Sequence, residues 1–206
     1  MTPIEYFKEY ICSNFPDRQN LLMENFKKYH KWLVRQNTLI NLISRKTDPM
    51  DIWTLHLLDS ILPVPPLSIE NQRVLDFGTG GGMPGIPLKV LFPSCAMTFL
   101  DSRAKKIDAV REAVEYLELE GCSFIAQRLE EISSSHFNQF DTVVCRSVRV
   151  EPRFKKPLLS LVKKGGRIIL YKSVILDDVE QFDSPTIRDV SHPAIGTRRI
   201  VEIVKR

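Results

Sequence analysis

The residues best suited to chemistry are two carboxylates on either side of a glycine-rich turn. Asp76 ends a short apolar run and is followed by Gly78 and Gly80, and Asp101 follows a second apolar run. Glycine is needed where the backbone takes unusual angles or must approach a ligand without a Cβ in the way. The helix start behind such a turn offers unpaired N–H donors. The pattern predicts a nucleotide-type ligand against the turn, with the second carboxylate on its ribose hydroxyls.

Two classes of cofactor fit this pattern. The Asp-x-Gly-x-Gly spacing that begins at Asp76 suits S-adenosylmethionine (SAM), which has no phosphate and whose positive amino group and sulfonium an acid helps to offset. Gly80, Gly82 and Gly85 also satisfy the G-x-G-x-x-G pattern of dinucleotide-binding turns. Asp101 serves either class. A chain of 206 residues leaves little room for the separate substrate domain of a dinucleotide enzyme, so we expect SAM and keep NAD as the alternative.

Composition limits the partners and the compartment. The net charge of +4 and the pI of about 8.9 are compatible with an anionic partner but do not require one. The four cysteines show no CxxC spacing, so we expect no disulfide framework, no metal site and a reducing cytoplasm. The N-terminus lacks a signal-peptide pattern, and no apolar run is long enough to span a bilayer. We therefore expect a cytoplasmic protein without a membrane partner.

The elements that must position the two carboxylates alternate between strand-like and helix-like segments. We expect strands near 73–77, 96–100, 123–126, 140–145 and 166–171, and helices near 84–92, 103–119 and 152–163. This alternation predicts a mostly parallel sheet covered on both faces. Two later apolar runs, 187–190 and 199–204, predict a terminal antiparallel hairpin. The expected fold class is α/β, a Rossmann-like SAM-dependent methyltransferase fold with a helical N-terminal extension.

The first sixty residues are predicted to be helical. Apolar residues at positions 22, 26, 29 and 33 follow helical spacing, and residues 51–62 form a second apolar-faced segment. The proline-rich stretch 63–66 ends this region. We therefore place a helical extension at residues 1–65 and the methyltransferase domain at residues 66–206.

Several motifs together are specific to one family. The turn continues as Thr79-Gly80-Gly81-Gly82-Met83-Pro84-Gly85-Ile86-Pro87-Leu88, and further blocks follow in order at 41–44, 56–60, 101–106, 128–131 and 145–147. Together they closely resemble the bacterial small-subunit rRNA guanine-N7 methyltransferases, also called glucose-inhibited division protein B. The resemblance covers most of residues 36 to 172. It departs at Leu55, where the family often has a basic residue, and at Ala104, where glycine is common.

The resemblance implies transfer of a methyl group from SAM to N7 of one guanine in the 16S rRNA of the small ribosomal subunit. It places Gly78, Gly80 and Met83 on the methionine side of the cofactor, and Arg146 between the cofactor and the incoming base. Asp101 would hold the ribose. The complete set expected to bind the cofactor is Asp76, Gly78, Gly80, Gly82, Met83, Asp101, Leu129, Glu130 and Arg146.

The expected catalytic group is Arg146, His56 and Asp59. His56 and Asp59 lie three residues apart on one helix face, where they either support the mouth of the site or simply pack the helix. Arg146 ends the fourth strand, a place that favours function in this architecture. Guanine N7 has a free lone pair, so the enzyme must align atoms rather than remove a proton, and we expect no general base. Cys145 is interpreted as a buried residue rather than a nucleophile.

Three other functions remain open on the sequence alone. One is a SAM-dependent methyltransferase of a small molecule or protein, another an NAD-linked oxidoreductase, and the third a catalytically silent ribosome-binding module. Basic residues recur along the chain and usually form a solvated face. A subset gathered around the cofactor mouth would supply the phosphate contacts that RNA binding needs.

Overall fold

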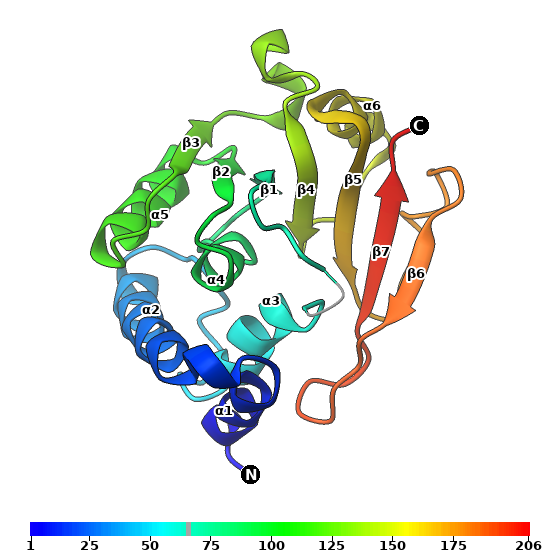
Figure 1. Cartoon of the computed structure of the whole chain (residues 1–206). Coiled ribbons are helices and arrows are strands. Elements are labelled where there is room, and N and C mark those ends of the chain that lie inside the picture. The colour runs from blue at the N-terminus through cyan, green and yellow to red at the C-terminus, as the bar shows by residue number, and fades with distance from the viewer. Residues whose placement is uncertain (65–66) are drawn as a thin grey trace.

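A mixed seven-stranded sheet forms the centre of the protein, as the computed structural model shows for residues 1–64 and 67–206 (Figure 1). The strand order is β3-β2-β1-β4-β5-β7-β6. The first five strands pair in parallel, whereas β7 pairs antiparallel with β5 and β6. This confirms the expected α/β class and its terminal hairpin. The strands are β1 Arg73–Phe77, β2 Ala96–Asp101, β3 Cys122–Ala126, β4 Phe140–Arg146, β5 Val162–Lys172, β6 Thr186–Asp189 and β7 Arg199–Val204.

The strand order brings the chemistry-bearing residues to one edge of the sheet. β1 lies between β2 and β4, so the chain winds outward in one direction through β3 and in the other through β5. Asp101 is the last residue of β2 and Arg146 the last residue of β4. Phe77, which ends β1, is in register with Leu100 and Cys145. In open α/β sheets, ligands bind at this reversal, outside the carboxyl ends of the strands.

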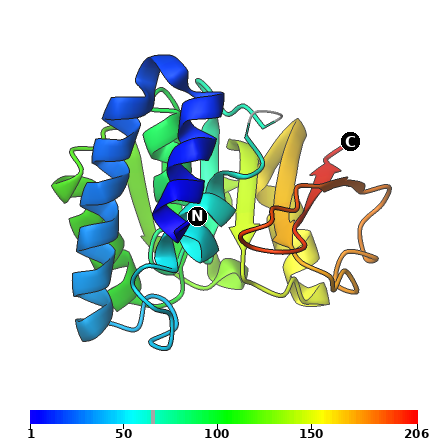
Figure 2. The ribbon, with the colours of Figure 1, turned by 90° about the horizontal axis from the view of Figure 1, so that it is seen from below.

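Helices cover both faces of the sheet, as alternation along the strands requires. Val74 belongs to a core that contains the N-terminal helices, α4 and α5, whereas Leu75 belongs to a second core beneath α6 (Figures 1 and 2). No helix in the described ranges is both long and apolar enough to cross a membrane. The helices are α1 Pro3–Asn14, α2 Gln19–Leu39, α3 Asp59–Ile61, α4 Gly85–Leu91, α5 Ala104–Tyr116 and α6 Pro152–Leu161.

The N-terminal helices share their core with the sheet. Phe7 of α1 and Phe26 of α2 are fully buried, and their rings meet edge to face with centroids 4.8 Å apart. Both belong to the same hydrophobic cluster as Phe99 of β2. The expected boundary at residues 65–66 lies outside the described residues, and the division into two domains stays a prediction.

The prediction that the first sixty residues are helical is wrong for residues 40–51. Oδ1 of Asn37 accepts the backbone N–H groups of Leu42 and Ile43 at 2.9 and 3.0 Å, which turns the chain away from the axis of α2. The segment that follows is also not a regular α-helix. Trp53–Leu58 is a π-helical turn that continues into α3. The carbonyl groups of Leu55 and His56 in this turn accept hydrogen bonds from Arg146.

Candidate active site

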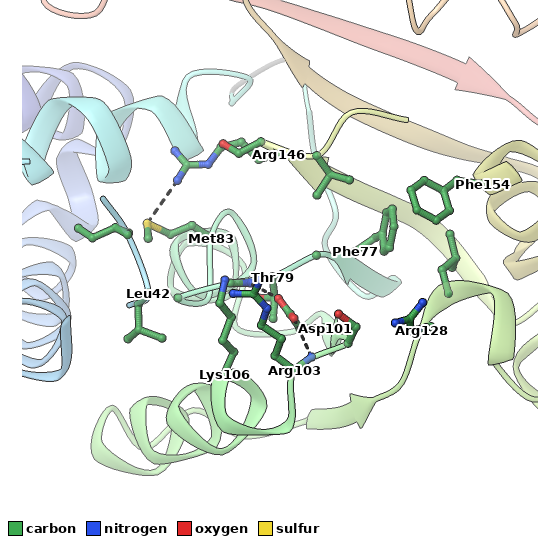
Figure 3. A pocket seen from close by; sticks show the side chains of 18 of the residues that line it. Leu42, Phe77, Thr79, Met83, Asp101, Arg103, Lys106, Arg128, Arg146 and Phe154 are labelled. Carbon is green, nitrogen blue, oxygen red and sulfur yellow. Dashed lines mark hydrogen bonds between the residues drawn. The ribbon is translucent and has the colours of Figure 1, made fainter. Parts of the chain in front are cut away.

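A cavity of about 520 Å³ opens at the carboxyl ends of β1, β2 and β4 (Figure 3). The structure brings most of the predicted site residues to its wall: His56, Gly78, Gly80, Met83, Asp101, Leu129, Glu130 and Arg146. Asp76, Gly82 and Asp59 do not line it. The wall also contains residues for which the sequence predicted no individual role. They are Leu42, Ile43, Ser44, Phe77, Thr79, Gly81, Ser102, Arg103, Lys106, Gln127, Arg128, Ser147, Val148, Arg153 and Phe154.

The turn after β1 needs glycine at its first position. Gly78 has a φ of +72°, and a Cβ there would lie 2.5 Å from Cγ2 of Val148 in the cavity wall. A side chain at this position would therefore both strain the backbone and push Val148 into the cavity. The close approach of the Val148 side chain to the backbone of Gly78 shapes this end of the cavity.

The N–H groups of the turn are largely committed to acceptors within the protein. The N–H groups of Gly78 and Thr79 donate to the carbonyl of Leu100, and those of Gly82 and Met83 donate to the carbonyl of Thr79. The N–H of Gly80 donates to Asp101, and that of Gly85 donates to Asp76. A dinucleotide site uses such N–H groups to hold its pyrophosphate. The turn is therefore poorly arranged for NAD and suits a ligand without phosphates.

Asp76 supports the turn from beneath. It is fully buried, and its Oδ2 accepts from the Thr79 hydroxyl at 2.6 Å and from the Gly85 N–H at 3.0 Å. Its Oδ1 has no hydrogen-bond partner among the described residues. Burial raises the pKa of Asp76 to about 7, although the bond from Thr79 opposes this shift. A buried carboxylate with an unpaired oxygen suits a cationic ligand such as SAM, whose charge would favour the ionised form.

Asp101 stands at the rim of the cavity and fixes the backbone on both sides of it. Its Oδ2 accepts the Gly80 N–H at 3.1 Å and its Oδ1 accepts the Arg103 N–H at 3.0 Å. Each carboxylate oxygen can accept more than one hydrogen bond, so hydroxyl groups of a ribose can still be held. Leu129 is buried beside Glu130. This combination of acid and apolar surface fits the ribose and adenine of SAM.

Arg146 closes the end of the cavity near Met83 and is only 8% exposed. Its Nη1 donates to Oδ2 of Asp59 at 2.9 Å and to the carbonyl of His56 at 3.2 Å. Its Nη2 lies 3.2 Å from Nδ1 of His56 and 3.5 Å from Sδ of Met83 (Figure 3). The three expected catalytic residues therefore form one hydrogen-bonded group, held partly by a carbonyl of the π-helical turn.

His56 is neutral at ordinary pH. Burial lowers its pKa to about 4, and the nearby charge of Arg146 lowers it further than Asp59 raises it. A guanidinium carries only donors, so Nδ1 of His56 accepts from Arg146. We therefore assign the ring proton to Nε2.

Asp59 links Arg146 to a residue that the sequence did not single out. Its Oδ1 accepts from Nε of Arg198 at 2.6 Å, across 139 positions of the chain. Asp59, Arg146 and Arg198 border a second cavity of about 250 Å³. Arg198 lies just before β7, in a turn-rich stretch without a motif, so no local signal marked it.

Burial bears on the interpretation of Cys145. Cys145 is 2% exposed, and burial raises the pKa of its thiol to about 12, which confirms a buried residue rather than an activated nucleophile. Within the described ranges, no three His, Cys, Asp or Glu side chains gather as they would around a metal ion.

Solved structures with the same arrangement of helices and strands support the fold. A tRNA (m1A58) methyltransferase from Aquifex aeolicus superposes with a TM-score of 0.61 over 80% of this chain and 73% of its own, at 15% sequence identity. A predicted O-methyltransferase from Agrobacterium tumefaciens gives a TM-score of 0.60 over 71% of this chain and 80% of its own, at 12% identity. The methyltransferase fold predicted from the sequence is confirmed.

The sequence matches one family over most of its length. The family model described as rRNA small subunit methyltransferase G, GidB, matches residues 22–193. The ribosomal RNA small subunit methyltransferase G of Staphylococcus epidermidis is 35% identical over 82% of this chain and 72% of its own. That of Flavobacterium johnsoniae is 34% identical over 88% of both chains. On these matches, and with the methyltransferase fold and its cavity in place, the chain belongs to the rRNA small subunit methyltransferase G family.

Proposed function

We propose that this protein transfers a methyl group from SAM to N7 of a guanine in 16S rRNA of the small ribosomal subunit. The observation that carries the proposal is the family match over residues 22–193. The matched segment contains the cavity whose carboxylate acceptors and apolar wall suit SAM. The carboxylate of Asp101 and the buried Asp76 match a cofactor with ribose hydroxyls and positive charge. The committed N–H groups of the turn argue against a dinucleotide.

The cofactor supplies the methyl group as an electrophilic carbon on a positively charged sulfur. Gly78, Gly80 and Met83 bind and orient its methionine end, Asp101 holds its ribose, and Leu129 with Glu130 borders its adenine. Gly82 and Asp76 act from beneath, where they keep the turn in shape. These roles rest on the position of each residue in the cavity wall or directly under it.

The protein's own part in the reaction is alignment. Guanine N7 carries a lone pair and no proton, so no side chain has to accept a proton before attack. Arg146 lies at the end of the cavity near Met83 and positions the incoming base, while Asp59 and His56 hold its guanidinium in place. Correct orientation of two reactants contributes roughly 7–11 kcal/mol in favourable cases.

The test is transfer of labelled methyl groups from SAM to small ribosomal subunits and to naked 16S rRNA. We expect label in one guanine, recovered as N7-methylguanosine. A matched transcript with 7-deazaguanosine at the labelled position should accept none, because it lacks the attacking nitrogen. Label found only in protein or in a small molecule would reject the proposal in favour of another methyltransferase activity. Tight binding of SAM without transfer to any RNA form would favour a silent binding module.

A further inference from the structure

The exposed cations around the cavity fall into two groups that differ in their partners. Arg45 and Lys46 lie on the loop after α2, Arg103 precedes α5, and Arg128 follows β3; all four are exposed. None of the four makes an ion pair with a carboxylate of the described residues. We call them the free cations.

The nearby carboxylates are engaged elsewhere. Asp101 accepts backbone N–H groups on both sides of the turn, and Oδ1 of Asp48 accepts the N–H of Met50 at 2.7 Å. Glu130 pairs with Arg153 at 3.3 Å. The charges of the free cations are therefore balanced by solvent and dissolved ions and not by a carboxylate of the described residues.

The adjoining flank of the cavity, around β4, β5 and α6, is different, because several of its cations form ion pairs with acids. Arg153 pairs with Glu151 at 3.1 Å as well as with Glu130, and Arg149 pairs with Asp177 at 2.6 Å. Further into the protein, Lys172 pairs with Asp178, and Arg198 pairs with Asp59 at 2.6 Å. The two flanks thus offer an anionic ligand very different surfaces.

The free cations lie at the mouth of the cavity. Arg103 and Arg128 belong to its wall, as does Ser44, the neighbour of Arg45. Figure 3 shows Arg103 and Arg128 across the cavity from Arg146. In Figure 2 the light-blue loop that carries Arg45 and Lys46 projects at the edge toward which the parallel strands point. The free cations therefore border one side of the cavity, and Arg146 the other.

We propose that the backbone of the RNA substrate crosses the flank formed by the loop 40–51, the start of α5 and the segment after β3. There Arg45, Lys46, Arg103 and Arg128 contact phosphates, and the target base reaches across the cavity to Arg146. This inference rests on the proposed function. Unpaired exposed cations bind phosphates with release of counterions, a gain that neutralised pairs cannot give without first losing their own partners.

The test is the salt dependence of binding to a 16S rRNA transcript. Each phosphate contact to a single strand adds about 0.7 to the slope of log K against log salt. The double variant Arg45→Gln/Lys46→Gln should therefore make this negative slope shallower by about 1.4. Calorimetric SAM affinity of this variant should match the wild type, because neither side chain lines the cavity; a loss of SAM affinity would overturn a phosphate role.

Two matched double variants serve as controls. Lys163→Gln/Lys164→Gln removes an adjacent pair of charges at the other end of the sheet, at the start of β5. Arg149→Gln/Arg153→Gln removes two charges on the α6 flank that are paired with acids. Both should keep the wild-type slope. An unchanged slope in Arg45→Gln/Lys46→Gln, or a larger loss in the α6-flank variant, would overturn the inference. Wild-type transfer of methyl groups to rRNA, measured in parallel, decides the proposed function separately.

Discussion

Nη2 of Arg146 lies 3.2 Å from Nδ1 of His56, and since a guanidinium only donates, the imidazole accepts. This relationship occupies the nitrogen that would otherwise be free to take a proton. Together with the lowered pKa of about 4, it makes His56 a weak base and a structural partner of Arg146. The consequences for catalysis can be tested directly.

Single-turnover methyl transfer at saturating SAM should be nearly flat in rate from about pH 6 to 8.5, a range well above the lowered pKa of His56. Because the pKa of His56 is lowered to about 4, its imidazole is already neutral at pH 6, and raising the pH further does not change its charge. His56→Asn should reduce the rate modestly and leave the shape of the profile unchanged. A rate that falls as the pH drops below about 7, and that no longer does so in His56→Asn, would show that the methylated atom carries a proton, which excludes guanine N7.

Arg146→Ala should lower kcat more than His56→Asn does, on the order of 10²-fold, because a base misplaced by about 1 Å reacts that much more slowly. Asp59 keeps Arg198 as a partner in this variant, so the fold should persist, which circular dichroism checks. Arg146→Lys should not restore the rate, since one ammonium cannot reproduce the fixed fork that holds Asp59 and His56 together. Full rescue by lysine would reduce the role of Arg146 to its charge.

Asp101→Ala should weaken SAM binding, because it removes charge-assisted hydrogen bonds to the ribose, each worth roughly 1.5–3 kcal/mol. It should also loosen the turn, because the N–H of Gly80 loses its acceptor. Titration calorimetry should show binding of SAM and its demethylated product to the wild type, and no binding of NADH. Tight NADH binding without any heat from SAM would overturn the cofactor assignment.

Gly78→Ala should destabilise the fold and weaken SAM binding, because the new methyl group would lie 2.5 Å from Cγ2 of Val148. Gly165 provides a matched control: its φ of +76° is similar, but nothing lies within 4 Å of an added Cβ. Gly165→Ala should therefore cost only the left-handed backbone strain, roughly 1–2 kcal/mol, with no effect on SAM. Equal losses in both variants, measured by denaturant unfolding and calorimetry, would show that the contact with Val148 is unimportant.

SAM affinity should increase as the pH rises through about 7, the raised pKa of Asp76. Below that pH the buried carboxyl is protonated and neutral; above it the carboxylate is negative and favours the positive ligand, so binding near pH 7 should release a proton. Calorimetry in buffers of different ionisation enthalpy measures this release, and Asp76→Asn should abolish it.

Ionisation of Asp76 should also affect folding stability. In the protein without SAM it should lower the stability as the pH rises, whereas it strengthens SAM binding. A folded-state pKa above the ordinary value of 3.8 means that the folded chain holds its proton more tightly. Stability from this group is therefore present at low pH and is lost as the pH rises from about 4 to 7. Asp76→Asn should remove that part of the pH dependence in thermal unfolding without ligand. A wild-type profile that Asp76→Asn leaves unchanged would contradict the assignment.

The sequence by itself determined the sheet and the position of the cofactor turn. Short apolar runs and the alternation of strands with helices are local signals, and they predict the strand at 73–77 and the terminal hairpin that the structure contains. Carboxyl ends of parallel strands meet at one edge for topological reasons, so the sequence alone predicts that Asp101 and Arg146 lie near the turn. The depth of Asp76 beneath the turn was not readable, since burial depends on what packs over it.

The tertiary structure decided what joins Arg146, Asp59 and Arg198 into one group. Arg198 reaches Asp59 across 139 positions, a contact that arises only when β7 pairs beside β5. The irregular segment 40–51 and the π-helical turn at Trp53–Leu58 also differ from the prediction. The side chain of Asn37 accepts backbone N–H groups of the first segment, and the distant Arg146 donates to a carbonyl of the second. The pairing of cations around the cavity has the same origin. The charge of each residue follows from its type, but the fold decides which distant segments meet and therefore which acid, if any, pairs with it.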